Sequence, residues 1–358
     1  NGTITAFDQS AFDATFEESI SKFHELSRSE AEHFVDKGYV VVKAAFSTDI
    51  AESVRKQAWL DLKTRHQITK DDPTSWDRSF VGPHGMHGYV RTTGSDAHFQ
   101  LETQAPRAFQ AQADAVGGRV RLPKNGVNLA WSDGAIANLG TATGWHPPKP
   151  RQPGWHKDGW HFRHFLNSPE QGLLTVPIYS NILPQSGGTF IATDSIGPVA
   201  RLLAKHPEGL HADSVQGSGY VIPNLIEQCS RFEELTGEAG DMVLLHPYVL
   251  HRVSENTSDR PRFIANAALV LNDPMQFDRA VGDPYSLVEL AVLRALQTNS
   301  LEFNTTRPMQ AVVPGPFRSE DERSKQNRLL NQEMRAMAAT GLITSTWGES
   351  LGYASNRR

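Results

Sequence analysis

Cysteine is almost absent from this chain, since Cys229 is the only one among 358 residues. A single cysteine cannot form a disulfide bond within the chain. It also excludes a cysteine-rich zinc site and an iron–sulfur cluster. Chains without disulfides are typical of reducing compartments, so we expect a cytoplasmic protein.

Long apolar runs and an excess of positive charge are also missing. No stretch of 18 apolar residues occurs, and the opening residues NGTITAFDQS lack the basic and apolar parts of a signal peptide. The formal net charge is −5 and the pI is about 6.3. We therefore expect neither a membrane nor a nucleic acid as partner. The sequence leaves the oligomeric state open.

What is present is a composition that can form a globular core, with 39% hydrophobic residues. The first 66 residues predict two helices around a strand. Ser27 and Glu30 have the spacing of a capping box, and Gly38 is expected to end that helix. The β-branched residues 39–43 predict the strand, and Thr-Asp at 48–49 can cap the second helix.

The middle of the chain is rich in short β-like segments. Glycine, proline, Asn and Asp separate candidate strands at 126–131, 135–139, 173–182, 241–246 and 262–271. A helix near 196–205 interrupts them. Because strands and helices do not alternate regularly, the pattern favours an antiparallel sandwich or barrel. The last 75 residues turn helical again, at 285–297 and 320–340.

The first motif that carries chemistry lies at residues 153–162, PGWHKDGWHF. In an extended segment, side chains two residues apart share a face, so His156 and Asp158 point the same way and Lys157 points the other way. One imidazole and one carboxylate at this spacing can bind adjacent positions on a metal ion. The alternative is a hydrogen-bonded surface pair, and the short motif alone does not decide between them.

The second motif is an apolar strand that runs into two histidines, His246 and His251, within residues 240–251. Either histidine could complete a set of two imidazoles and one carboxylate. Such a facial triad leaves three positions of an octahedron open and is the signature of oxygen-activating non-haem iron(II). For each histidine, the alternative to a metal ligand is a core residue whose ring nitrogens are hydrogen-bonded within the protein.

The third motif is an arginine after a predicted turn. Residues 254–261 are dense in turn formers, and Arg262 then begins a strand beside the one that leads to His251. A guanidinium there can bind a carboxylate through two parallel hydrogen bonds. A surface arginine is the alternative, and Arg260 competes with Arg262 because it shares the same facing in an extended chain.

In this order, the motifs resemble the phytanoyl-CoA dioxygenase family of Fe(II)/2-oxoglutarate-dependent oxygenases. The resemblance covers about residues 27–270. Its features are the strand at 39–43, Trp-His-x-Asp at 155–158, the Ser-Gly-Gly turn at 186–188, Gly-Asp followed by the apolar strand and His251, and Arg262 eleven residues after that histidine.

The resemblance implies a fold that is mainly β with helices. The core would be a double-stranded β-helix (jelly-roll, cupin-like) with N-terminal and C-terminal helical additions. It implies one oxygenase domain over residues 1–358, with the family-like core at 27–270. Residues 271–358 would form a helical C-terminal extension, which matches no motif of the family.

The resemblance also implies the roles of individual residues. The iron ligands would be His156, Asp158 and His251, with the second histidine of its motif preferred over His246. Arg262 would bind the far carboxylate of 2-oxoglutarate. Thr189, directly after the Ser-Gly-Gly turn, and Ser254, shortly after the distal histidine, would be further cofactor-binding residues.

The implied reaction consumes 2-oxoglutarate and O2 at Fe(II) and releases succinate and CO2. Its expected outcome is hydroxylation of a small molecule, and the expected context is secondary metabolism. Halogenating relatives lack the carboxylate ligand, so Asp158 argues against halogenation. Desaturation, epoxidation and ring rearrangement stay open, because they depend on how the substrate is held.

Arg91, Trp160 and Arg163 are candidate substrate residues. The two arginines would suit an acidic substrate group, and residues 82–91 form a glycine-rich polar segment that could be a substrate loop or a plain surface loop. Two other functions stay open, a metal-binding jelly-roll protein with a binding or regulatory role and a jelly-roll metal isomerase or hydrolase. A zinc cluster of His156 with His161 and His164 is a further alternative.

Overall fold

The computed structural model describes residues 4–76, 88–124, 129–140, 144–152, 154–212, 223–314 and 317–339. Residues 126–128 of one predicted strand, residues 82–87 of the predicted substrate loop and Pro153 lie outside the described residues. None of the described helices combines the length and the apolar character needed to cross a membrane.

The N-terminal region holds two helices on either side of a strand, as predicted. Helix α2 (Arg28–Lys37) begins with the capping box of Ser27 and Glu30. It ends at Gly38, whose φ of 76° lies in the left-handed region. Strand β2 (Tyr39–Val42) follows, and then α3 (Thr48–His66).

Two details of this region differ from the prediction. The N-cap of α3 is Ser47, whose hydroxyl accepts from the Ile50 amide, rather than the Thr-Asp pair that follows it. An additional helix, α1 (Gln9–Ile20), precedes α2 and is capped by Asp8.

A four-stranded antiparallel sheet lies at the centre of the molecule, in the order β13–β7–β10–β2. Strand β7 is Leu173–Pro177, β10 is Met242–Leu245 and β13 is Ala267–Leu269. Every residue of β7 and β10 is buried. Both faces of these strands are therefore covered, which explains why their sequences are apolar runs rather than alternating patterns.

Two three-stranded antiparallel sheets carry the motifs of interest, in the orders β11–β8–β9 and β12–β6–β3. In the first sheet, β11 is His251–Val253, β8 is Thr189–Ala192 and β9 is Phe232–Leu235. In the second sheet, β12 is Arg262–Ile264, β6 is Ile136–Asn138 and β3 is Tyr89–Arg91. A two-stranded sheet joins β4 (His98–Gln100) to β5 (Ala130–Ser132). The expectation of antiparallel sheets with added helices is confirmed.

The predicted strand 262–271 is divided between two sheets. Its first part, β12, pairs with β6, and its second part, β13, pairs with β7. The change of sheet falls at Ala265 and Asn266, where the Ala265 amide donates to the carbonyl of Pro177. This crossing ties the sheet that carries Arg262 to the central sheet.

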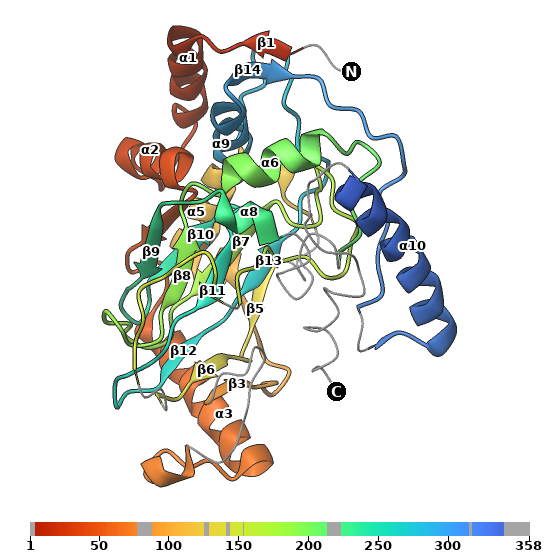
Figure 1. Cartoon of the computed structure of the whole chain (residues 1–358). Helices are drawn as coiled ribbons and strands as arrows, with labels where there is room; N and C mark the ends of the chain where they lie inside the picture. Colours follow the sequence, from red (N-terminus) through yellow and green to blue (C-terminus); the bar gives the residue numbers. More distant parts are fainter. Residues whose placement is uncertain are drawn as a thin grey trace.

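Helices cover one end of the sheets (Figure 1). The apolar helix α9 (Leu287–Leu296) packs against α2, α5 (Pro106–Val116) and α6 (Ile196–Ala204). Helix α9 starts with a second capping box, formed by Ser286 and Glu289. Two short helices, α4 (Leu101–Gln104) and α8 (Pro223–Glu227), also precede α9.

The C-terminal part of the chain contains a strand as well as helices. Strand β14 (Thr298–Leu301) pairs with β1 (Ile4–Ala6), a pairing that the prediction of an all-helical C-terminal region missed. Helix α10 (Glu320–Ala339) runs along one side of the molecule, drawn in dark blue (Figure 1). Its bounds agree with the helix predicted at 320–340.

Candidate metal centre

Three side chains from distant parts of the sequence converge on one point. The Nε2 atom of His156 lies 3.4 Å from Asp158 Oδ1, and the Nε2 atom of His251 lies 3.5 Å from Asp158 Oδ2. The three potential ligand atoms all lie within 4.8 Å of one another, and no other such group of His, Cys, Asp and Glu occurs in the described part of the chain. Two imidazoles and one carboxylate facing a common point fit the facial triad of non-haem iron.

Backbone pairing fixes the two histidines side by side. His156 and His251 form an antiparallel bridge, in which each amide donates to the carbonyl of the other at 3.0 Å. Directly opposite residues of such a pair project to the same side, so their ring centroids lie 4.3 Å apart. Since side chains two residues apart share a face, Asp158 joins them from the same strand segment.

Each imidazole is also oriented by a backbone carbonyl. Nδ1 of His156 lies 2.7 Å from the carbonyl oxygen of Gly154, and Nδ1 of His251 lies 3.0 Å from that of Val249. A carbonyl can only accept, so each Nδ1 carries a proton, and in the neutral form of each ring the lone pair is on Nε2. This tautomer is the one that a metal ligand needs.

The carboxylate of Asp158 is held by Asn266, whose amide donates to Oδ2. Burial alone would raise the pKa of Asp158, but the two histidines outweigh it and hold that pKa well below its ordinary value. Burial likewise opposes the charged form of His251, yet Asp158 raises the pKa of His251. The Asp158 site is thus built to remain anionic.

His246 belongs to the core rather than to this group. It is fully buried, its Nε2 lies 3.1 Å from the carbonyl of Val288 in α9, and its Nδ1 accepts from the Tyr248 amide at 3.0 Å. Both ring nitrogens are therefore occupied. Burial lowers the pKa of His246 to about 3, which keeps the ring neutral.

The zinc cluster considered from the sequence does not form within the described residues. His164 stacks on Phe162, and its ring nitrogens contact the carbonyl of Gly159 and Nζ of Lys157. Neither His164 nor His161 joins His156 at the candidate metal centre. Lys157 is buried, and its Nζ contacts the carbonyl of Asp158 at 3.1 Å and Nδ1 of His164 at 2.7 Å.

Arg262 is a buried cation, with 1% of its surface exposed. Its Nε donates to the carbonyl of Gly187 at 2.7 Å and its Nη1 to that of Ile136 at 3.2 Å. Burial lowers the pKa of Arg262 to about 10, so the group is still charged near neutrality. No carboxylate of the described residues forms an ion pair with it, whereas Arg260 is exposed.

Thr189 and Ser254 lie at the same end of two paired strands. Thr189 is opposite Val253 in the β8–β11 pairing, and the Ser254 amide donates to the carbonyl of Gly188. The Ser254 hydroxyl is buried and accepts from Nε1 of Trp145 at 3.1 Å. Ser254 thus has a partner within the protein.

The three expected substrate residues lie in different environments. Arg91 is exposed on β3, and Trp160 has 46% of its surface exposed two residues after Asp158. Arg163 is buried and forms an ion pair with Glu333 of α10. Its charge is therefore already balanced inside the protein.

Sequence reasoning missed Asn266. It follows Arg262 by four residues, so strand alternation could have assigned both side chains to one face. The signal was weak because Asn is common in turns, and because the strand changes sheet at this position. The Oδ1 atom of Asn266 is buried without a hydrogen-bond partner among the described residues.

Several solved structures resemble parts of this chain. One is the non-heme alpha-ketoglutarate-dependent carbocyclase SnoK from nogalamycin biosynthesis, at 17% identity, with 72% of this chain and 89% of that chain covered and a TM-score of 0.41. Another is the epimerase SnoN in complex with Fe3+, alpha-ketoglutarate and nogalamycin RO, at 16% identity, with 68% and 82% covered and a TM-score of 0.37. HygX from Streptomyces hygroscopicus, with nickel and 2-oxoglutarate bound, has 16% identity, 67% and 85% coverage and a TM-score of 0.34.

No curated protein matches this chain significantly. The family model of phytanoyl-CoA dioxygenase (PhyH), in contrast, matches residues 34–264, which is more than half of the chain. This range includes all three residues of the candidate metal centre and Arg262. The chain belongs to the phytanoyl-CoA dioxygenase family and is an iron- and 2-oxoglutarate-dependent oxygenase.

Proposed function

We propose that this protein hydroxylates a small molecule of secondary metabolism at an iron(II) ion held by His156, Asp158 and His251. The observation that carries the proposal is the convergence of these three side chains with both Nδ1 atoms already bound to carbonyls. When bound there, iron(II) supplies O2 activation coupled to the decarboxylation of 2-oxoglutarate to succinate and CO2.

Arg262 is proposed to bind the far carboxylate of 2-oxoglutarate. A buried guanidinium without a counter-ion is costly, so a ligand that brings a carboxylate stabilises it. Nε of Arg262 also donates to the carbonyl of Gly187. Gly187 lies two residues before Thr189, where β8 begins, and β8 pairs with β11. Thr189 and Ser254 are proposed to lie near the same co-substrate.

Arg91 and Trp160 are proposed to contact the substrate. An exposed indole two residues from Asp158 suits an apolar or ring-containing group, and Arg91 suits an acidic one. Arg163 is less suitable, since Glu333 already neutralises it. The way these side chains hold the substrate decides between hydroxylation and the other outcomes, which are desaturation, epoxidation and ring rearrangement.

The finer description of the fold is also a proposal. The sheets that carry β8, β11 and β12 are proposed to form a double-stranded β-helix with the metal centre at one mouth. Residues 1–358 would then make one domain, with 27–270 as its core and 271–358 as a C-terminal extension. The single cysteine supports a cytoplasmic location.

The test measures iron binding and succinate formation together. Wild type and variants are loaded anaerobically with iron(II), and iron content is determined before 2-oxoglutarate, O2 and a panel of candidate substrates are added. His251→Ala and Asp158→Ala should lose both iron and succinate formation. His161→Ala is the matched control, because it removes a nearby imidazole outside the triad.

Two results would contradict the proposal. If His251→Ala binds iron as well as wild type, the ligand set is wrong. If wild type binds iron fully but forms no succinate with any compound, and none in the uncoupled reaction, a binding or regulatory role replaces the oxygenase.

A further inference from the structure

Lys157 and His164 form a buried pair directly beside Asp158, the carboxylate of the candidate metal centre. Lys157 has 2% of its surface exposed and His164 has 0%. Nζ of Lys157 lies 2.7 Å from Nδ1 of His164. Among the described residues Lys157 forms no ion pair, so its charge is buried among neutral acceptors. A buried lysine is costly, and this one therefore calls for a specific role.

The ammonium group of Lys157 is surrounded by as many acceptors as it has donors. Besides His164, its Nζ contacts the carbonyl of Asp158 at 3.1 Å and Oε1 of Gln171 at 3.4 Å. An ammonium group has three donors, and these three contacts use all of them. The position of Lys157 is thus fixed, and through it the position of the Asp158 carbonyl.

The second ring nitrogen of His164 holds the next carbonyl along the chain. Its Nε2 contacts the carbonyl oxygen of Gly159. Because that oxygen has no proton to give, Nε2 is the donor, and Nδ1 then has the lone pair that accepts from Lys157. Lys157 and His164 together hold the two carbonyls that directly follow the side chain of Asp158.

The conformation of Gly159 makes these contacts necessary. Its φ of 120° lies in the left-handed region, and a Cβ there would lie 2.6 Å from Cε1 of His164 and 2.7 Å from Cζ of Phe162. Glycine permits this close approach, but it also leaves the backbone free to take many other conformations. The contacts of Lys157 and His164 select one of them.

His164 is itself a rigid point of attachment. Its amide and its carbonyl both pair with Leu210, at 2.8 Å each, and its ring stacks on Phe162 with the centroids 4.4 Å apart. The imidazole therefore cannot follow a movement of Gly159 without breaking these contacts. It holds the backbone after Asp158 against a fixed part of the protein.

We propose that Lys157 and His164 are positioning residues of the metal centre. By fixing the Asp158 and Gly159 carbonyls, they keep the backbone in the conformation that directs the Asp158 carboxylate toward the two histidines. The inference rests on the ligand set of the proposed function and concerns residues outside that set.

Charge and position give opposite expectations for Lys157. A positive charge near a bound metal cation repels it, so the loss of that charge alone would strengthen iron binding. The loss of a contact that orients a metal ligand weakens iron binding. The direction of the change in iron affinity therefore separates the two roles.

The test measures the dissociation constant for iron(II), anaerobically against a competing chelator and without 2-oxoglutarate. Lys157→Met has a side chain of similar length without the ammonium group, and it should raise this constant about 10–100-fold. His164→Phe keeps a ring beside Phe162 but loses both hydrogen bonds, and it should raise the constant by a similar factor. The two effects should not add in the double variant, since both substitutions break the same set of contacts.

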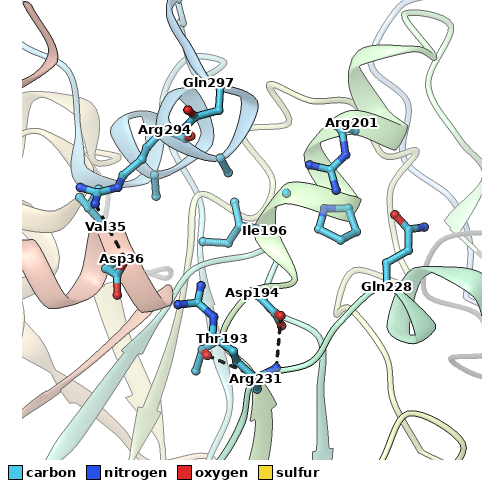
Figure 2. Close-up of a pocket in the computed structure, with 14 residues that line it drawn as sticks. Val35, Asp36, Thr193, Asp194, Ile196, Arg201, Gln228, Arg231, Arg294 and Gln297 are labelled. Carbon is cyan, nitrogen blue, oxygen red and sulfur yellow. Dashed lines mark hydrogen bonds and ion pairs between the residues drawn. The ribbon is translucent and has the colours of Figure 1, made fainter. Parts of the chain in front are cut away.

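The control is Arg201→Met, which removes one positive charge outside the metal centre. Arg201 is an exposed residue of α6 and lines a cavity of about 330 Å³ that includes none of the three proposed ligands (Figure 2). This variant should bind iron as wild type does. Circular dichroism and denaturant unfolding of the iron-free proteins show which variants are folded.

Unchanged or tighter iron binding by folded Lys157→Met and His164→Phe proteins would overturn the proposal, even if both are less stable than wild type. Should Lys157→Met not fold, His164→Phe decides, because its ring fills the same space. Normal iron binding by Asp158→Ala would instead show that the ligand set is wrong, which is a failure of the proposed function.

Discussion

At the scale of single residues, the position of the Asp158 carboxylate depends on the amide of Asn266. Without this donor the carboxylate can rotate away from the two imidazoles. We predict that Asn266→Leu raises the dissociation constant for iron(II) by about 10–100-fold, as is usual for a residue that orients a metal ligand. Anaerobic titration against a competing chelator measures it.

The control for this variant is Asn304→Ala, which removes an exposed amide far from the metal centre in sequence. It should bind iron as wild type does. An unchanged dissociation constant in Asn266→Leu would mean that the backbone alone orients Asp158.

Arg262 and Arg260 offer a second comparison between neighbouring residues. If Arg262 binds the far carboxylate of 2-oxoglutarate, Arg262→Ala should cost about 2–5 kcal/mol of binding, or about 30- to several-thousand-fold in apparent affinity. Arg262→Lys should recover part, because an ammonium lacks the fork of the guanidinium. Arg260→Ala should change little, since Arg260 is exposed.

The measurement is the dependence of succinate formation on 2-oxoglutarate concentration in the three variants. Arg262 also binds two backbone carbonyls, so unfolding curves must show that the variants stay folded. Normal 2-oxoglutarate affinity in a folded Arg262→Ala protein would remove Arg262 from the co-substrate site.

Much of the candidate site was predictable at this scale, because the rules involved are local. The two-residue spacing of His156 and Asp158 was enough to predict that they share a face. His251 could be preferred over His246 only by resemblance to a family. The contacts of His246 with α9 and Tyr248 explain the difference, but they depend on packing that no local pattern reveals.

At the scale of elements, helix α10 is held against the segment that follows Asp158 by contacts of Arg163. The Arg163 amide donates to the carbonyl of Gln310, and the Arg163 side chain pairs with Glu333 of α10. Glu333 also accepts from the His211 amide at 2.8 Å. These contacts join the C-terminal helix to the segment that follows Asp158.

We predict that Glu333→Gln releases α10. Breaking a buried ion pair costs about 3–5 kcal/mol, and the lower end applies because the Glu333 side chain is 19% exposed. Denaturant unfolding should show the loss, and trypsin should cleave within α10 faster than in wild type. Glu320→Gln, an exposed change of equal charge on the same helix, is the control. Equal cleavage rates in both variants would refute the role of Glu333.

Elements were predictable where their signals were strong and local. The capping box of Ser27 and Glu30 and the glycine at position 38 correctly predicted α2. Strand 262–271 was predicted as one piece, because its β-branched and apolar residues do not reveal which partner each half pairs with. Strand β14, of sequence TNSL, has weak strand propensity and exists because β1 pairs with it.

At the scale of the whole molecule, the buried His246 should make folding sensitive to acid. Its pKa is about 3 in the folded protein, against 6.5 as the ordinary value. Between these two pKa values, His246 binds a proton in the unfolded chain but not in the folded protein. Stability should fall as the pH drops from about 6.5 toward 3, by about 5 kcal/mol at most from this residue.

Denaturant unfolding of the iron-free protein, measured from pH 7 downward, checks this. His246→Gln should be less stable than wild type at pH 7, because the hydrogen bonds of His246 with Val288 and Tyr248 are disturbed. Its stability should then fall less steeply with acid. Parallel curves for the two proteins would show that other groups govern acid unfolding.

The pairing of β1 with β14 delays the folding of β1 during synthesis. Ile4 lies opposite Leu301, about 300 residues later in the chain. A ribosome adds about 5–20 residues per second, so β1 waits about 15–60 s for its partner to be synthesised. Among the described strands, β1 is thus the first to leave the ribosome and one of the last to be paired, and until then its backbone stays open to other chains.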